Sequence, residues 1–350
     1  MLRTPAYAAA TAGAPLAPFT IERRAPRARE VLIDILYCGI CHSDVHSARD
    51  EWGGGLFPMV PGHEIVGRIA RIGADVASFA VGDLVGVGCF VDSCRQCEPC
   101  RAGEEQYCER GMTATYNSRE RDTQLPTYGG YSTRITVDAD YVLHIPDGLP
   151  PDRAAPLLCA GITTYSPLKR FGAGDGREVA VIGLGGLGHI AVKIARAMGA
   201  RVTVLSSSEA KRDAALALGA HDFAATRDAR TFKRLARRFD LVLDTVSAAH
   251  DYNACLGLLR LDGTMVLLGI PERPAPLAAY VLIGRRRRLT GSLIGGIRET
   301  QEMLDFCARH GIAADIELID IARINEAYDR MVRSDVRYRF VIDMASLRGG

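Results

Sequence analysis

The chain has 350 residues, which is enough for two domains of ordinary size, each with its own core. Hydrophobic residues make up 48% of it and charged residues 24%, the balance of a globular protein, and the formal net charge is only +2. So small a charge argues against nucleic acid or a membrane surface as the main partner. No apolar stretch approaches the ~20 residues that a membrane-spanning helix needs.

The first 18 residues are rich in alanine but are interrupted by Pro5, Gly13 and Pro15, so they lack the compact apolar core of a secretory signal. We therefore expect a cytoplasmic protein, in which thiols stay reduced. The chain nevertheless contains ten cysteines. In a reduced compartment these need an explanation other than disulfides, and metal binding is the first candidate.

Residues 1–150 are expected to be rich in short strands, because apolar runs alternate there with Gly, Pro and Asp turns. The clearest strands are predicted at residues 31–37, 65–72 and 84–87. Two consecutive prolines, Pro150 and Pro151, mark a change of pattern.

From residue 179 onward, apolar strands alternate with amphipathic helices. Short continuous apolar strands between helices predict a parallel sheet that is covered on both faces. Strands are predicted at residues 179–182, 201–205, 241–244 and 265–268, and helices at 187–198 and 209–218. After residue 296 we expect two more helices, at 300–310 and 324–333, and a last strand at 338–342.

A glycine-rich loop lies between the strand at 179–182 and the helix that follows it. The pattern G-x-G-x-x-G in this strand–helix context indicates dinucleotide binding. Gly183 allows the tight turn, Gly185 lets the backbone approach a pyrophosphate, and Gly188 allows close packing. The helix N-terminus then offers unpaired N–H groups to the phosphates. The loop consists of Gly183, Leu184, Gly185, Gly186, Leu187 and Gly188.

The end of the next strand should determine which cofactor is bound. Proteins that bind NAD carry an acidic residue there, about 20 positions after the glycines, whereas this chain has Ser206. Nothing at Ser206 would repel a 2′-phosphate, so we predict NADP(H). The nearby cations Lys211 and Arg212 have an alternative interpretation, as part of a solvated helix face. The predicted phosphate-binding groups are Ser206, Ser207, Ser208, Lys211 and Arg212.

Four cysteines lie within fifteen positions of one another. Thiolates at such short intervals can surround one ion in a closed tetrahedral shell, which leaves no position for substrate and is therefore typical of a structural zinc site. An iron–sulfur cluster is the competing interpretation, but it needs a matching second set of cysteines, which the sequence lacks. We therefore predict a structural zinc bound by Cys94, Cys97, Cys100 and Cys108.

A second set of metal-binding residues is dispersed along the chain. Cys41 follows a predicted strand, His63 precedes another, and Cys159 lies just ahead of the glycine-rich region. Each alone is more often a packed core residue. Together, two thiolates and one imidazole would bind zinc with one position open, as catalytic sites do.

These motifs, taken together, resemble the zinc-containing medium-chain alcohol dehydrogenases, and most closely their cinnamyl alcohol dehydrogenase group with its bacterial NADP-dependent aldehyde reductases. The resemblance runs from about residue 30 to about residue 343. It is carried by the cysteine lobe and by C-H-S-D at 41–44, G-H-E at 62–64, L-C-A-G-I-T at 158–163, G-L-G-G-L-G at 183–188, G-S-L-I-G-G at 291–296 and Y-R-F-V at 338–341.

The resemblance implies an α/β fold of two domains. Residues 1–152 and 298–350 would form a GroES-like, β-rich catalytic domain that carries the structural zinc lobe. Residues 153–297 would form a Rossmann NADP-binding domain with a doubly wound, six-stranded parallel sheet. It also implies two zinc ions per chain, a homodimer, and an alcohol or aldehyde as the small-molecule substrate.

The resemblance further assigns roles around the catalytic zinc and the cofactor. Glu64 corresponds to the carboxylate that approaches the metal during ligand exchange, and Asp44 to the carboxylate that orients the His63 imidazole. Ser43 and His46 correspond to the proton relay. Residues Thr163, Ser292 and Ile294 fall where the nicotinamide end of the cofactor is bound.

The sequence leaves two other functions open. One is an NAD-linked polyol or secondary-alcohol dehydrogenase of the same superfamily, which a preference for NADH would reveal. The other is a zinc-containing or redox-sensing protein without catalysis, which would have no use for an open metal position. The run Arg285–Arg288 is interpreted as a solvated loop, with contact to a cofactor phosphate as the alternative.

Overall fold

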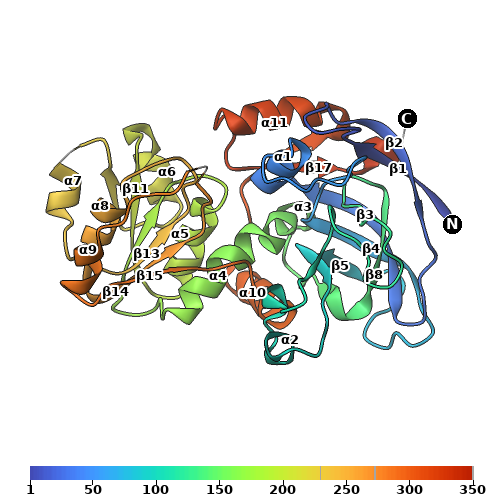
Figure 1. Ribbon diagram of the computed structural model, residues 1–350, viewed down its shortest axis with the longest axis horizontal. Helices are drawn as coiled ribbons and strands as arrows, with labels where there is room; N and C mark the ends of the chain where they lie inside the picture. Colours follow the sequence, from blue (N-terminus) through green and yellow to red (C-terminus); the bar gives the residue numbers. More distant parts are fainter. Residues whose placement is uncertain (229, 272, 349–350) are drawn as a thin grey trace. The chain divides into compact units, whose positions relative to one another are not determined.

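A computed structural model describes residues 1–228, 230–271 and 273–348 (Figure 1). The chain divides into two compact units. Unit 1 comprises Met1–Cys159 and Gly295–Gly350, and unit 2 comprises Ala160–Ile294. The domain limits expected from the sequence, near residues 152 and 298, stay a prediction. No helix in the described part of the chain is long and apolar enough to span a membrane.

Unit 1 is built on a seven-stranded sheet in which β16, β17, β3, β4, β5 and β9 follow one another and β8 also pairs with β3. The strand β3, which is almost wholly buried, pairs antiparallel with β4, β8 and β17, so it forms the centre of this core. The strands are β3 (Glu30–Gly39), β4 (Ile65–Ile72), β5 (Leu84–Val87), β8 (Arg134–Asp138), β9 (Leu143–His144), β16 (Ile316–Asp320) and β17 (Arg339–Asp343).

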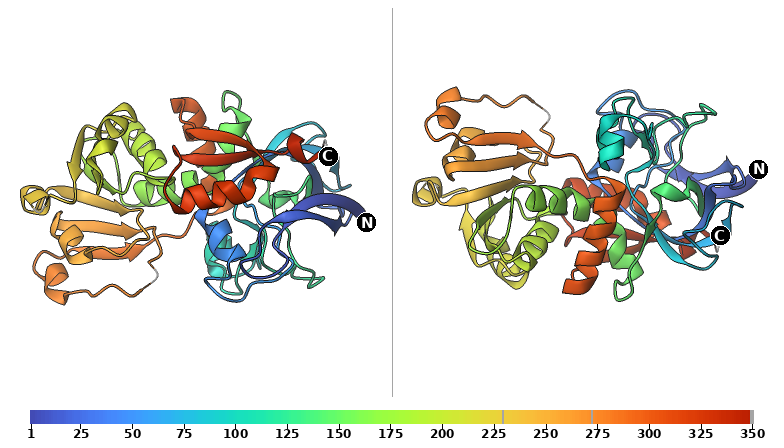
Figure 2. Two further views of the ribbon diagram at one scale, coloured as in Figure 1. Left: turned by 90° about the horizontal axis from the view of Figure 1, so that it is seen from above. Right: turned by 90° about the horizontal axis from the view of Figure 1, so that it is seen from below.

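The remaining elements of unit 1 surround this sheet. Two small antiparallel pairs are β1 (Leu2–Ala8) with β2 (Ala17–Arg23), and β6 (Phe90–Asp92) with β7 (Thr113–Ala114). The left view of Figure 2 shows α11, in red, beside the C-terminal strands. The helices are α1 (His42–Ala48), α2 (Glu98–Ala102), α3 (Pro151–Ala154), α10 (Ile297–His310), α11 (Ile324–Val332) and α12 (Ala345–Arg348).

Unit 2 contains a six-stranded sheet whose strands are all parallel, in the order β12-β11-β10-β13-β14-β15. This is the order of the doubly wound dinucleotide-binding fold, in which the first strand lies next to the fourth. The predicted fold class is therefore confirmed. The strands are β10 (Glu178–Ile182), β11 (Arg201–Ser206), β12 (Asp222–Ala225), β13 (Phe239–Asp244), β14 (Leu259–Leu267) and β15 (Arg288–Gly291).

Helices of unit 2 connect and cover these strands; for example, α5 packs against β10 and β11, and α8 packs against β14. Apolar side chains of β10, β13 and β14, such as Ala180, Val242 and Met265, are fully buried in a shared core. The helices are α4 (Ala160–Arg170), α5 (Gly188–Ala197), α6 (Arg212–Ala217), α7 (Arg230–Arg234), α8 (Tyr252–Gly257) and α9 (Ala279–Ile283).

Two expected elements of unit 2 are corrected by the structure. The helix expected at 209–218 begins with a separate 3-10 turn, Glu209–Lys211, and α6 starts only at Arg212; such tight turns are frequent at helix N-termini. The strand expected at 265–268 starts at Leu259. The Asp262-Gly263 pair indicated a turn, but β14 continues through it, with Asp262 at a positive φ of 61°.

Candidate active site and metal clusters

The first turn of α1 holds Cys41 and Asp44 in fixed positions. The strand β3 ends at Gly39, and Cys41 takes the N-cap position of α1 with an extended backbone. The Asp44 side chain, at the third position of the helix, accepts a hydrogen bond of 2.8 Å from the backbone N–H of Cys41. This satisfies one of the unpaired N–H groups of a helix N-terminus, as in a capping box. The C-H-S-D motif therefore fixes the Cys41 backbone next to a buried carboxylate.

His63 is held by the same carboxylate. Its Nδ1 lies 3.0 Å from Asp44 Oδ1, and both side chains are buried. Burial disfavours the imidazolium, but the Asp44 charge outweighs it and raises the pKa of His63 well above its usual value. The contact at Nδ1 leaves Nε2 as the nitrogen that can bind a metal.

Cys159 completes this cluster from a position far along the chain. It follows the 3-10 turn Ala155–Leu158, and its Sγ lies 4.0 Å from Cys41 Sγ. One donor atom each from Cys41, His63, Glu64 and Cys159 lies within 4.8 Å of the others. A hydrogen bond between the two thiols lowers the pKa of Cys41 and raises that of Cys159. The structure thus brings together the three predicted catalytic ligands and the predicted neighbouring carboxylate.

Glu64 has a partner that the sequence did not reveal. Its carboxylate is fully buried and forms an ion pair with the buried guanidinium of Arg339, from β17. Burial raises the pKa of Glu64 to about 7, against the opposing effect of the Arg339 charge. The Arg339 cation therefore keeps a carboxylate beside the metal cluster within reach of ionisation near neutral pH.

The two predicted relay residues lie on α1. Ser43 Oγ is 3.7 Å from Cys41 Sγ, at the edge of the cluster. His46, one turn further along, is partly exposed and stacks on Trp52 with ring centroids 5.0 Å apart. Its Nδ1 also pairs with Glu51, a partner that the sequence pattern did not indicate. The helix thus leads from the cluster to a solvent-accessible imidazole.

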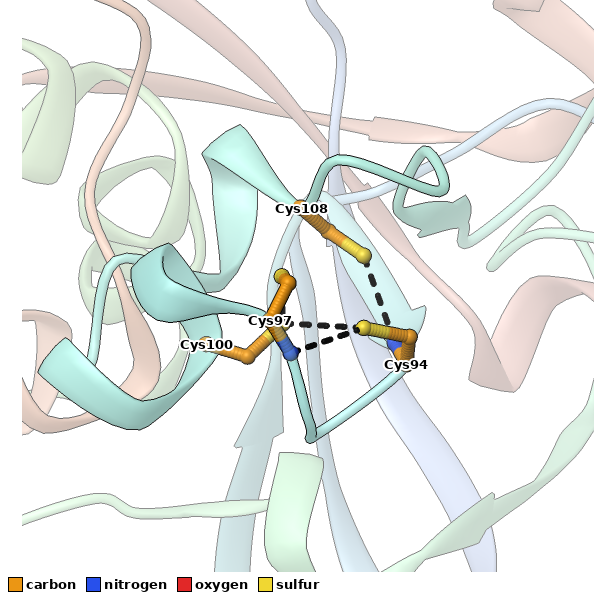
Figure 3. Close-up of side chains that lie close together, drawn as sticks. All are labelled: Cys94, Cys97, Cys100 and Cys108. Atoms are coloured by element: carbon orange, nitrogen blue, oxygen red, sulfur yellow. Dashed lines mark hydrogen bonds between the residues drawn. The ribbon is translucent and has the colours of Figure 1, made fainter.

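The four predicted structural cysteines converge in a second cluster, shown in Figure 3. One Sγ atom from each lies within 4.8 Å of the others. The Sγ–Sγ distances include 3.9 Å between Cys94 and Cys100 and 3.3 Å between Cys97 and Cys100. Backbone N–H groups also point at these sulfurs, for example from Cys94 to Cys108 Sγ at 3.3 Å. Four sulfurs in this arrangement fit a tetrahedral zinc without an open position.

Three glycines of the glycine-rich loop in unit 2, Gly183, Gly185 and Gly188, differ in backbone conformation and surroundings. Gly183 adopts a φ of 92°, which favours glycine. A Cβ on Gly188 would lie 2.1 Å from the Gly183 carbonyl oxygen, whereas a Cβ on Gly185 would meet no described atom within 4 Å. The strand β10 and the helix α5 are therefore packed at Gly188, while the space at Gly185 is open for a phosphate.

The residues predicted to bind the 2′-phosphate follow β11. Ser206 is buried at the end of this strand, and its Oγ accepts a bond from the Ser208 N–H at 3.4 Å; Ser207 lies between them. Lys211 Nζ donates to the Leu184 carbonyl at 2.9 Å, so this cation lies over the glycine-rich loop. Arg212 is exposed and pairs with Glu209 at 2.6 Å.

Other predicted residues of unit 2 are placed as follows. Thr163 is buried in α4, and Ser292 and Ile294 follow β15. The arginine run is bound within the unit: Arg286 pairs with Asp262 at 2.7 Å, and Arg287 donates to three backbone carbonyl groups.

An ion pair in unit 2 was not expected from the sequence. At the carboxyl end of β13, buried Asp244 pairs with His250, with 2.9 Å between Oδ2 and Nε2. The hydrogen bond with Asp244 raises the pKa of His250 to about 10. This imidazolium ties the segment after β13 to the strand end. Next to Asp244, Thr245 Oγ1 donates to the carbonyl of Ile182 at 2.8 Å, at the end of β10 and just before the glycine-rich loop.

Comparison with known proteins agrees with this architecture. Residues 27–147 match the alcohol dehydrogenase GroES-like domain, and residues 186–309 match the zinc-binding dehydrogenase family. The chain is 60% identical over 98% of both chains to NADP-dependent alcohol dehydrogenase C 1 of Mycolicibacterium smegmatis, and 52% identical over 99% of both to aldehyde reductase YahK of Escherichia coli. A cinnamyl alcohol dehydrogenase structure from Sorghum bicolor superposes with a TM-score of 0.96, at 45% identity over 98% of each chain.

The chain therefore belongs to the zinc-containing medium-chain alcohol dehydrogenases, and it is an oxidoreductase that uses zinc and NADP(H). Within that family it is a member of the cinnamyl alcohol dehydrogenase group. Its substrates are alcohols and aldehydes.

Proposed function

We propose that this protein interconverts small aliphatic or aromatic aldehydes and their alcohols at the cluster of Cys41, His63 and Cys159. The observation that carries this proposal is the convergence of two thiols and one imidazole, from three distant segments, within 4.8 Å of one another. Zinc bound there would act as a Lewis acid on the substrate oxygen, while NADPH supplies hydride to the carbonyl carbon. The four-cysteine lobe would hold a second zinc that is structural.

The side chains around the cluster would orient its ligands and move protons. Asp44 would keep the His63 imidazole in one tautomer through the contact at Nδ1. The Ser43 hydroxyl would pass a proton between the substrate oxygen and His46, which is partly exposed and can exchange it with solvent. Glu51 would hold the His46 ring in place through their contact. Glu64 would serve as the alternative carboxylate during exchange of ligands at the metal.

For the cofactor, we propose that the glycine-rich loop binds the pyrophosphate and that the Ser206–Ser208 segment binds the 2′-phosphate, with Lys211 and Arg212. The open space at Gly185 supports the first assignment. The hydroxyl of Ser206, at the end of β11, supports the second because it carries no charge that would repel a phosphate. The side chain of Thr163 and the backbone of Ser292 and Ile294 would bind the nicotinamide end.

We further propose a homodimer formed through unit 2. The strand β15 is the last strand of the described sheet, so its outer edge can pair with another strand. Nearby α9 exposes large apolar side chains: Tyr280 is 80% exposed and Ile283 is 71% exposed. Exposed apolar clusters of this kind mark protein contacts. Sedimentation analysis should show a dimer for the wild type and monomers for Ile283→Asp, whereas Leu216→Asp, an exposed site on α6, should remain dimeric.

The proposed location is the cytoplasm, because zinc coordination by the two clusters requires reduced cysteines. All ten cysteines of the structure are free thiols.

Metal analysis together with aldehyde reduction tests the proposed reaction. The wild type should contain about two zinc ions per chain and oxidise NADPH with benzaldehyde or a short aliphatic aldehyde. Cys159→Ala should contain about one zinc ion and show no reduction. Cys307→Ala removes a buried thiol outside both clusters, so it should keep both zinc ions and activity. Full turnover by Cys159→Ala would refute the proposed site.

A further inference from the structure

We propose that two buried tyrosines, Tyr131 and Tyr141, are positioning residues for the two metal clusters. Tyr131 would act on the catalytic cluster through Asp44, and Tyr141 on the structural cluster through Ser93. This inference rests on the proposed function, in that both clusters must bind zinc.

The Asp44 carboxylate receives four hydrogen bonds although it is completely buried. Oδ2 accepts from the Cys41 N–H at 2.8 Å and from the Tyr131 hydroxyl at 3.2 Å. Oδ1 accepts from the Gly62 N–H at 3.1 Å and lies 3.0 Å from His63 Nδ1. Three of these donors belong to the two segments that carry metal ligands. The Tyr131 hydroxyl is the fourth donor and comes from a different segment, so it opposes rotation of the carboxylate away from His63.

The backbone keeps Tyr131 next to the segment that leads into His63. The Tyr131 N–H donates to the Pro61 carbonyl at 3.0 Å, and the Gly130 N–H donates to the Gly62 carbonyl at 2.8 Å. Gly62 has a φ of 102°, and a Cβ there would lie 2.8 Å from Tyr131 Cδ1. The tyrosine ring therefore packs directly on the residue before His63, and its hydroxyl reaches Asp44 from a fixed position.

Burial raises the pKa of Tyr131 well above its usual value, so its hydroxyl stays protonated and remains a donor. A second tyrosine, Tyr328, donates to the Tyr131 oxygen at 3.5 Å. Tyr328 is one bond further from the carboxylate, and it provides a control position in the same buried network.

In the structural cluster, a tyrosine hydroxyl likewise contacts a buried side chain that itself lies next to a metal-binding residue. Ser93 is buried, and its Oγ lies 3.2 Å from Cys100 Sγ and 2.8 Å from the Tyr141 hydroxyl. A cysteine that binds zinc is a thiolate and has no proton to donate. The Ser93 hydroxyl must then donate to the Cys100 sulfur, and the Tyr141 hydroxyl must donate to Ser93. Burial raises the pKa of Tyr141 to about 12, which keeps it protonated for this role.

Partners of metal ligands orient the ligands, and losing one typically changes metal affinity ~10–100-fold. Tyr131 is one hydrogen bond further from the metal than such a partner, so Tyr131→Phe should speed release of the catalytic zinc by at most about 10-fold and leave the structural zinc unchanged. Tyr141→Phe should have the opposite selectivity. Each substitution keeps the ring and removes only the hydroxyl, so a tyrosine that acts through packing alone would leave both release rates nearly unchanged.

Zinc release to a chromophoric chelator, 4-(2-pyridylazo)resorcinol, tests this with the full-length protein. The phase that is missing in Cys159→Ala identifies the catalytic zinc. Tyr131→Phe should accelerate only this phase, Tyr141→Phe only the other, and Tyr328→Phe neither to a comparable extent. As a second measurement, Tyr131→Phe should add no acceleration in an Asp44→Asn background, and Tyr141→Phe none in a Ser93→Ala background.

Three results would overturn this inference and leave the proposed function standing. They are unchanged zinc release in both tyrosine variants, equal acceleration of both phases in either variant, and additive effects in the double variants. A wild-type protein that releases no zinc would contradict the proposed function together with the inference.

Discussion

Replacing Arg339, the cation that pairs with Glu64, by an uncharged residue should destabilise unit 1 strongly. Arg339 is 5% exposed, and its Nη2 donates to Glu64, whose side chain is fully buried. Arg339→Met keeps most of the side-chain volume, so the main effect is on the buried Glu64 carboxyl, which loses its counterion and must either stay charged or take up a proton. Removal of one partner of a buried ion pair costs up to about 3–5 kcal/mol. Glu64 Oε2 already finds no hydrogen-bond partner among the described residues, so little else can compensate.

A double variant distinguishes the effect of the unpaired Glu64 carboxyl on stability from the effect of lost Arg339 packing. Replacing both members of a buried pair by uncharged groups is often nearly neutral. Glu64→Gln combined with Arg339→Met should therefore recover most of the stability that Arg339→Met alone loses. The strong coupling between the two substitutions is the quantity to be measured.

Urea unfolding of the zinc-loaded protein provides the assay. Trp52 is the single tryptophan of the chain and stacks on His46 in unit 1, so its fluorescence reports on this unit. The expected order of unfolding midpoints is wild type, then the double variant, then Arg339→Met. If Arg339→Met unfolds at the same urea concentration as the wild type, or if the double variant is no more stable than the single one, the reasoning is wrong.

Three further predictions concern unit 2. Gly185→Val should fold normally, because its Cβ meets no described atom, but it should lose NADPH binding in a fluorescence titration, because the side chain fills the phosphate space. Gly188→Ala should instead lower the melting temperature, since its Cβ would lie 2.1 Å from the Gly183 oxygen. Ser206→Asp should weaken NADPH binding by about 10-fold or more relative to NADH binding, because a carboxylate repels the 2′-phosphate by at least ~1.4 kcal/mol. The same ratio of NADPH affinity to NADH affinity in the wild type and the variant would contradict this. His250→Gln should lower the melting temperature most below about pH 6.5, the usual pKa of histidine, because the ion pair stabilises the protein only while His250 stays protonated. The difference from the wild type should therefore shrink as the pH rises toward 10. A difference that does not change with pH would count against the ion pair.

The sequence predicted those parts of the fold that depend on local pattern. The strands expected at 65–72 and 84–87 have the bounds of β4 and β5, because short apolar runs between turn residues determine both ends. The start of β14 was missed because Asp262 and Gly263 are typical turn residues; they lie in an irregularity between the pairs Phe239–Leu259 and Leu241–Thr264, and the pairing with β13 on both sides keeps them within the strand. Local signals thus located strands well except where tertiary pairing overrides turn preference.

For the candidate site, the donor atoms could be predicted from residue type and spacing, but their partners could not. Cys41, His63 and Cys159 carry chemistry that a motif reveals. Arg339 lies 275 positions from Glu64, and only the pairing of β17 with β3 brings them together. Tyr131 likewise reaches Asp44 from 87 positions away. Such contacts depend on the packing of whole elements, which no short sequence pattern records.

A crystal structure with anomalous diffraction measured at the zinc absorption edge would show whether zinc binds between Cys41, His63 and Cys159. One zinc peak is expected among Cys41 Sγ, His63 Nε2 and Cys159 Sγ, at ~2.0–2.3 Å from each, and a second peak among the four sulfurs of the cysteine lobe. A map with the lobe peak but no zinc between Cys41, His63 and Cys159 would contradict this expectation.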